Sequence, residues 1–114
     1  MIEICNLRNC KMEHVYDVRV DRKSILGNPF YMKDESKRDE VCDKYEEYFN
    51  ANIVMNDDFH KEMNRLIEIY VKYGKLRLFC WCYPKRCHSE IIKDFIIDFV
   101  DNISENLRNE ILNA

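Results

Sequence analysis

Glycine and proline, the residues that most often interrupt helices and strands, are scarce in this sequence, which has two of each among 114 residues. Hydrophobic residues make up 46% and charged residues 34%, a balance typical of a helix-rich globular protein and not of a disordered chain. A chain of this length can bury a core without disulfides or a metal. We therefore expect a single domain over residues 1–114.

The sequence also lacks an excess of positive charge and any long apolar run. Its net charge is −3, with the two signs interspersed, which argues against the basic face that bulk binding to DNA or RNA requires. No segment approaches the roughly 20 apolar residues of a membrane span. The N-terminus does not have the basic and then apolar layout of a signal peptide. We expect a cytoplasmic protein without nucleic-acid or membrane partners.

Six cysteines are present. In a reducing compartment we expect them to remain thiols. Cys80, Cys82 and Cys87 lie close together in the sequence, whereas the other three are scattered. Only this cluster needs a special explanation.

Hydrophobic patterns predict three strands. Alternation indicates strands at Ile2–Leu7 and Val15–Val20. Leu76–Cys82 is a short apolar run that follows a glycine, which is typical of a buried central strand.

Helical spacing predicts four helices: about 37–50, from about Asn56 to Gly74, from about Ser89, and a short one from Ser104. Ser36 and Asp39 resemble a capping box for the first helix. The order of elements favours an α/β fold with a small, mainly parallel sheet flanked by helices in a Rossmann-like layering.

The segment Cys80-Trp81-Cys82-Tyr83-Pro84-Lys85-Arg86-Cys87-His88 leaves the carboxyl end of the central strand. In α/β sheets ligands bind at that edge. Cys87 and His88 are expected at the start of the next helix, where backbone N–H groups and the helix dipole favour an anion. That anion is either a bound phosphate or carboxylate or the thiolate of Cys87 itself.

A second candidate is the loop Arg22–Phe30. Gly27 permits close backbone approach, Asn28 offers a donor and an acceptor, and Arg22 and Ser24 could hold an anionic group. The alternative interpretation is an ordinary turn.

Three other interpretations of the Cys/His cluster remain open. Cys80, Cys82, Cys87 and His88 supply a Cys3His set, which is known from zinc sites. Alternatively, Cys80 is a small buried hydrophobe and His88 caps a helix. Cys82 and Cys87 could also form a disulfide that acts as a redox switch.

The motifs Gly27-Asn28-Pro29-Phe30 and Cys80–His88, in this order, make the chain resemble domain-of-unknown-function family 4326, small proteins of bacteria and their phages. Other matching pieces are Asn6-Leu7-Arg8, Tyr16-Asp17-Val18, Arg22, Glu40-Val41 and Tyr45. The resemblance implies that the loop and the Cys/His segment form one site. Asp21 and Ser89 stand where members often carry glycine. The Pro-x-x-Cys-His ending is also similar to domain-of-unknown-function family 488, an α/β family.

We predict a pocket that binds a small anionic ligand, such as a nucleotide or nucleotide sugar, without a cofactor. The predicted ligand-binding residues are Arg22, Ser24, Gly27, Asn28 and Cys82. Cys87 and His88 are the candidate catalytic residues, with His88 as general acid or base if a reaction occurs.

Two rival hypotheses come from other classes of protein. One is a non-catalytic module stabilised by zinc on Cys80, Cys82, Cys87 and His88. The other is a phage or bacterial interaction protein that docks through exposed rings of Tyr45, Tyr48 and Phe49.

Overall fold

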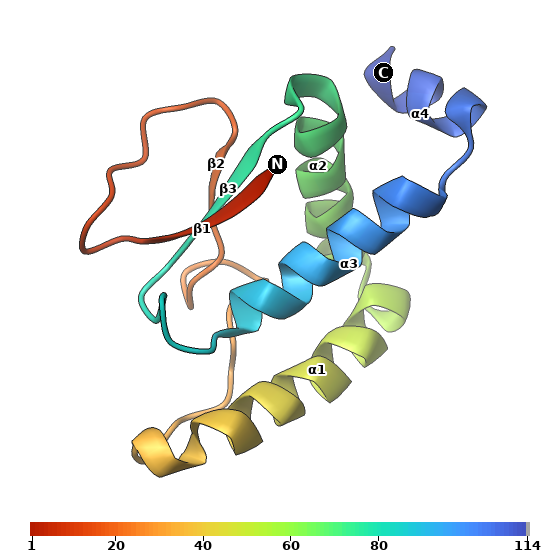
Figure 1. The fold of residues 1–114 in the computed structure, drawn as a ribbon. Helices are drawn as coiled ribbons and strands as arrows, with labels where there is room; N and C mark the ends of the chain where they lie inside the picture. Colours follow the sequence, from red (N-terminus) through yellow and green to blue (C-terminus); the bar gives the residue numbers. More distant parts are fainter. Residues whose placement is uncertain (114) are drawn as a thin grey trace.

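The computed structural model describes residues 1–113 and contains a three-stranded parallel sheet with four α-helices (Figure 1). The strands are β1 (Ile2–Asn6), β2 (Asp17–Arg19) and β3 (Leu76–Cys80), in the order β1-β3-β2. The helices are α1 (Arg38–Met55), α2 (Asp57–Tyr73), α3 (His88–Asn102) and α4 (Glu105–Leu112), with a 3-10 helix, η1, at Glu35–Lys37. The predicted α/β fold with a small parallel sheet is confirmed.

β3 lies between the other two strands, and its side chains other than Arg77 are apolar, as expected for a strand buried on both faces. Leu76 and Leu78 belong to the core beneath the helices, and Phe79 is also fully buried. In Figure 1, α2 and α3 lie on the right of the sheet, α1 runs below it, and the β1–β2 connection loops out on the left.

All three strands are shorter than predicted, and β1 loses only Leu7. β3 ends at Cys80 and not at Cys82, because the Asn6 side chain binds the next carbonyl groups: its Nδ2 donates to Trp81 O at 3.1 Å and Tyr83 O at 2.8 Å. β2 covers only Asp17–Arg19, although Val20 N still donates to Phe79 O at 3.0 Å just beyond its end.

The junction between α1 and α2 is a single residue, Asn56. Its backbone N–H donates to Asn52 O at 3.0 Å and ends α1, while its Oδ1 accepts from Asp58 N and Phe59 N and begins α2. The first helix therefore runs five residues beyond the predicted end at Asn50. The last turn of α1 buries little, because Val54 and Met55 are exposed.

The predicted capping box at Ser36 is wrong. Ser36 lies inside η1, and its N–H donates to Asp34 Oδ1 at 2.9 Å. Lys37 precedes α1 without a side-chain cap. The carboxylate of Asp34 already caps the preceding turn, so α1 continues directly from it.

The exposed aromatic surface of the interaction hypothesis is wrong for two of its three rings, and the third, Tyr48, is half-buried against the core. Tyr45 and Phe49 are 0% and 1% exposed. The Tyr45 hydroxyl donates to Leu26 O at 2.6 Å, and the Phe49 ring packs at 5.5 Å from Phe59 of α2 and 5.3 Å from Phe95 of α3. These rings are core residues because α1 turns them towards its helical neighbours. Within residues 1–113, no helix combines the length and the apolarity needed to cross a bilayer.

Candidate functional site

A pocket of about 490 Å³ opens beside the carboxyl edge of the sheet, and we call it the basic pocket. Both predicted segments line it. The loop contributes Arg22, Lys23, Asn28 and Phe30, and the Cys/His segment contributes Trp81, Cys82, Arg86, Cys87 and His88. The other lining residues are Arg19, Asp21, Met32, Arg38, Val41 and Cys42.

The two segments meet because parallel strands end at the same edge of a sheet. β2 leads into Asp21 and the loop, and β3 leads into Trp81 and the turn. Asn6, the last residue of β1, holds that turn through its bonds to the Trp81 and Tyr83 carbonyls. The peptide between Tyr83 and Pro84 is cis. Asn6 is thus a positioning residue, although it does not line the pocket itself.

Asp21 links the two walls. Its buried carboxylate accepts two bonds from Arg19, at 2.8 and 2.7 Å, and one from Trp81 Nε1 at 2.9 Å. The Arg19 guanidinium and, more weakly, the Trp81 N–H and the Lys23 backbone N–H hold the pKa of Asp21 below its usual value. This aspartate replaces the glycine expected from the family resemblance, and it fixes the indole of Trp81 at the rim.

Arg22 folds its own loop. Its Nε donates to Asn28 O at 3.2 Å and its Nη2 to Phe30 O at 2.9 Å. Asn28 Oδ1 accepts from Phe30 N at 2.9 Å. Because these partners of Arg22 are neutral carbonyls, its positive charge is not cancelled within the loop.

Ser24 and Gly27, two of the predicted ligand-binding residues, do not line the basic pocket. Ser24 Oγ accepts from Leu26 N at 3.0 Å and stabilises the turn. A Cβ on Gly27 would lie 2.3 Å from Asp21 O and 2.6 Å from Arg22 Cα. The glycine is therefore required for a close approach of backbone to backbone, where we had expected an approach of backbone to ligand.

His88 is buried and both of its ring nitrogens have partners. Nε2 lies 2.5 Å from Val20 O and Nδ1 lies 3.4 Å from Cys87 Sγ. A carbonyl only accepts, so Nε2 carries the hydrogen and Nδ1 presents its lone pair to the thiol. Burial lowers the pKa of His88, which favours this neutral form.

The Cys87 thiol also contacts Ser89, whose Oγ lies 3.3 Å from its Sγ. Interaction with Cys80 and Cys82, together with burial, raises the pKa of Cys87. Interaction with Cys87 and with the nearby guanidinium of Arg38 lowers the pKa of Cys82. Cys87 therefore keeps its proton more readily than Cys80 or Cys82 does.

The geometry does not fit the predicted zinc set of Cys80, Cys82, Cys87 and His88. Among residues 1–113 no group of three or more His, Cys, Asp or Glu side chains is placed to hold a metal ion. Tetrahedral zinc needs four ligand atoms aimed at one point. His88 cannot supply one here, because its nitrogens face Val20 O and Cys87 Sγ.

Several pocket residues were not predicted from the sequence. Arg38, Val41 and Cys42 come from α1, and their approach depends on how that helix docks. Asp21 could have been singled out from the sequence, because it stands beside Arg22 at a position where members of the family often carry glycine. Trp81 lay inside the predicted motif but was not assigned a role.

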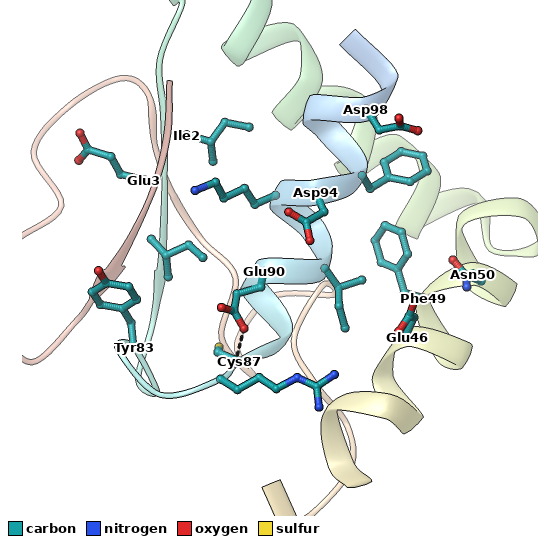
Figure 2. Close-up of a pocket in the computed structure, with 15 residues that line it drawn as sticks. Ile2, Glu3, Glu46, Phe49, Asn50, Tyr83, Cys87, Glu90, Asp94 and Asp98 are labelled. Carbon is teal, nitrogen blue, oxygen red and sulfur yellow. Dashed lines mark hydrogen bonds between the residues drawn. The ribbon is translucent and has the colours of Figure 1, made fainter. Parts of the chain in front are cut away.

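A larger cavity of about 1000 Å³ lies between β1, α1 and α3 (Figure 2). Its lining carboxylates are Glu3, Glu46, Glu90, Asp94 and Asp98, against the cations Arg86 and Lys93. Arg86 and Cys87 line both cavities, and the Cys87 backbone N–H donates to Glu90 Oε2 at 3.2 Å (Figure 2). The excess of carboxylates makes this second cavity unsuitable for an anion.

Fold and site together define a small α/β protein with a basic, thiol-lined pocket at the carboxyl edge of a parallel sheet. The chain belongs to the family described as domain of unknown function (DUF4326), which matches residues 5–98. That range includes both segments that line the pocket. The chain matches no curated protein and no solved structure.

Proposed function

We propose that the basic pocket binds a small anionic ligand of the nucleotide class, including nucleotide sugars. The observation that carries this proposal is the sign of the lining charge. Five basic side chains, Arg19, Arg22, Lys23, Arg38 and Arg86, face one carboxylate, Asp21. The chain as a whole has a net charge of −3, so the pocket concentrates positive charge on an otherwise negative protein.

Two of these charges are available to a ligand. Arg19 pairs with Asp21, Arg38 with Glu35, and Arg86 with Asp39 and Asp43. Arg22 and Lys23 form no ion pair with any other residue in the range 1–113. The amino terminus of α3 begins at His88 on the same wall and adds the positive end of a helix dipole.

Trp81 favours a ligand that also carries a flat ring. Its side chain is 51% exposed at the pocket, and the bond from Nε1 to Asp21 fixes its orientation. An exposed and oriented indole can stack on a nucleobase, a contact worth about 1–3 kcal/mol. The apolar side chains of Phe30 and Met32 line the same space. Its volume lies in the range of small-molecule sites.

Thermal unfolding of the full chain tests this proposal. The additives are nucleoside mono-, di- and triphosphates, a nucleotide sugar and inorganic phosphate. A nucleotide at about 100 times its Kd should raise Tm by on the order of 10–20 °C, and phosphate alone by much less. No shift with any nucleotide contradicts the proposal.

Two variants locate the binding. Lys23→Gln removes an unpaired charge from the pocket without breaking a loop contact, and should weaken nucleotide binding about tenfold. Lys61→Gln, an exposed lysine of α2 outside the pocket, is the matched control and should bind normally. Trp81→Ala should remove the preference for nucleotide over phosphate. Equal binding by all three variants contradicts the assignment to this pocket.

A further inference from the structure

We infer that Cys82 and Cys87 form a thiol–disulfide exchange site, in which Cys82 attacks a small anionic disulfide and Cys87 completes a protein disulfide. The substrate class is an aliphatic disulfide bearing carboxylates, of which oxidised glutathione is an example. This activity goes beyond nucleotide binding and does not depend on it.

Access to the pocket selects Cys82 as the attacking thiol. Cys82 is half-buried and lines the basic pocket, whereas Cys80 and Cys87 are 0% and 3% exposed. An entering disulfide therefore meets Cys82 first. Arg22 and Lys23 line the same space and carry charges that carboxylates of the substrate can use.

The surroundings of Cys82 stabilise its thiolate, which is the attacking species in exchange. The Arg38 guanidinium of α1 lines the same pocket as Cys82, and interaction with Cys87 and then with Arg38 lowers the pKa of Cys82. Arg38 is in turn oriented by two bonds to Glu35 and one to Arg86 O, each 2.9 Å long. The Arg38 guanidinium is therefore held in place before any substrate arrives.

Cys87 is placed to complete the reaction. It lines the basic pocket together with Cys82, and each of the two thiols shifts the pKa of the other, as neighbouring thiols do. Its Sγ also lies 3.4 Å from His88 Nδ1, the unprotonated nitrogen of the imidazole. His88 is thus a base for the second thiol, and its ring is oriented by the bond from Nε2 to Val20 O.

The two steps balance. First, the Cys82 thiolate forms a bond to one sulfur of the substrate, the substrate S–S bond breaks, and a small thiolate leaves and takes a proton from water. Second, Cys87 gives its proton to His88 Nδ1 and attacks the Cys82 sulfur. The second small thiolate leaves and takes that proton. Two protein thiols are oxidised to one disulfide, and the substrate is reduced to two thiols.

Peptide mapping by mass spectrometry tests the inference on the reduced full-length chain. The chain is exposed to oxidised glutathione, and samples are quenched with acid over time. The Cys82–Cys87 disulfide should form at least about tenfold faster than glutathione adds to Cys10, an exposed thiol in the same molecule. Cys87→Ser should accumulate glutathione on Cys82. Cys82→Ser should give neither product, and Cys10→Ser should behave as wild type.

Two results overturn the inference: Cys82 reacting no faster than Cys10 in the wild type, or a first disulfide between another pair. If the Cys87→Ser variant fails to fold by circular dichroism, the wild-type time course alone decides. Nucleotide thermal shifts on the same samples separate the two proposals, because a chain that is stabilised by nucleotides but inert to glutathione contradicts only the exchange site.

Discussion

The indole of Trp81 donates a 2.9 Å hydrogen bond to the buried carboxylate of Asp21, which joins the two walls of the basic pocket across 60 positions of sequence. Asp21 also accepts two bonds from Arg19 and one from the Lys23 backbone. The orientation of the rim therefore depends on one carboxylate.

Replacing that carboxylate should destabilise the fold. Asp21→Ala leaves the Arg19 guanidinium and the Trp81 N–H without their acceptor, which should lower the free energy of unfolding by about 1–3 kcal/mol. Urea denaturation followed by circular dichroism measures the change. Asp101→Ala, at an exposed position of α3, is the control and should stay within about 0.5 kcal/mol of wild type. Equal effects of the two substitutions contradict the role of Asp21.

The same carboxylate should make the stability of the fold depend on pH in the acid range. The bonds from Arg19 hold the folded pKa of Asp21 below 3.8, and Arg38 and Lys85 lower that of Glu35 to about 2. These groups stabilise the fold fully above their unfolded pKa values, and the contribution is lost as pH falls through the folded ones. Urea midpoints should therefore drop steeply between about pH 4 and pH 2. The Asp21→Asn variant should show a shallower drop over this window.

His88 should add a second pH dependence near neutrality. Burial lowers its folded pKa below 6.5, so the unfolded chain binds a proton first as pH falls. Stability should therefore decrease as pH falls below about 6.5. The His88→Gln variant should be less stable than wild type at pH 8, and its stability should depend less on pH in this window. His60→Gln, at an exposed position of α2, should keep the wild-type slope, and a flat wild-type profile contradicts the buried neutral imidazole.

Substitution of either glycine should lower stability, but only one of the two substitutions should also weaken nucleotide binding. Gly27→Ala forces a Cβ against the Asp21 and Arg22 backbone, which should cost about 1–3 kcal/mol or more and displace Arg22. Gly74→Ala meets no atom within 4 Å but has a φ of 68°, so it should cost about 1–2 kcal/mol. Nucleotide binding, measured by titration calorimetry, should weaken only in Gly27→Ala. Weaker binding in both variants would show that the effect is not local.

Much of the fold was predictable because several local signals agree. For α2, the cap at Asn56, the apolar stripe and the glycine at Gly74 predict the same helix. For β3, the apolar run from Leu76 predicts a central strand. The end of α1 was missed because its last turn buries little, and the end of β3 was missed because a distant side chain, Asn6, stops it.

The site was predictable only in part. The rule that ligands bind at the carboxyl edge of a parallel sheet placed the Cys/His segment at a site, and the family resemblance added the loop to it. The contribution of Arg38 depends on the docking of α1, which no local pattern encodes. Gly27 was assigned to a ligand because sequence alone does not distinguish close approach to a ligand from close approach to Asp21 O.

The single-residue junction at Asn56 also restricts how the chain can change in length. Because an α-helix turns by about 100° per residue, one residue inserted or deleted there would rotate the apolar stripe of α2 away from α1 and β3. The helical phase of the two longest helices is therefore set at this junction. The β1–β2 connection is a loop and does not fix the rotation of one helix relative to another. Insertions and deletions should therefore be tolerated there instead.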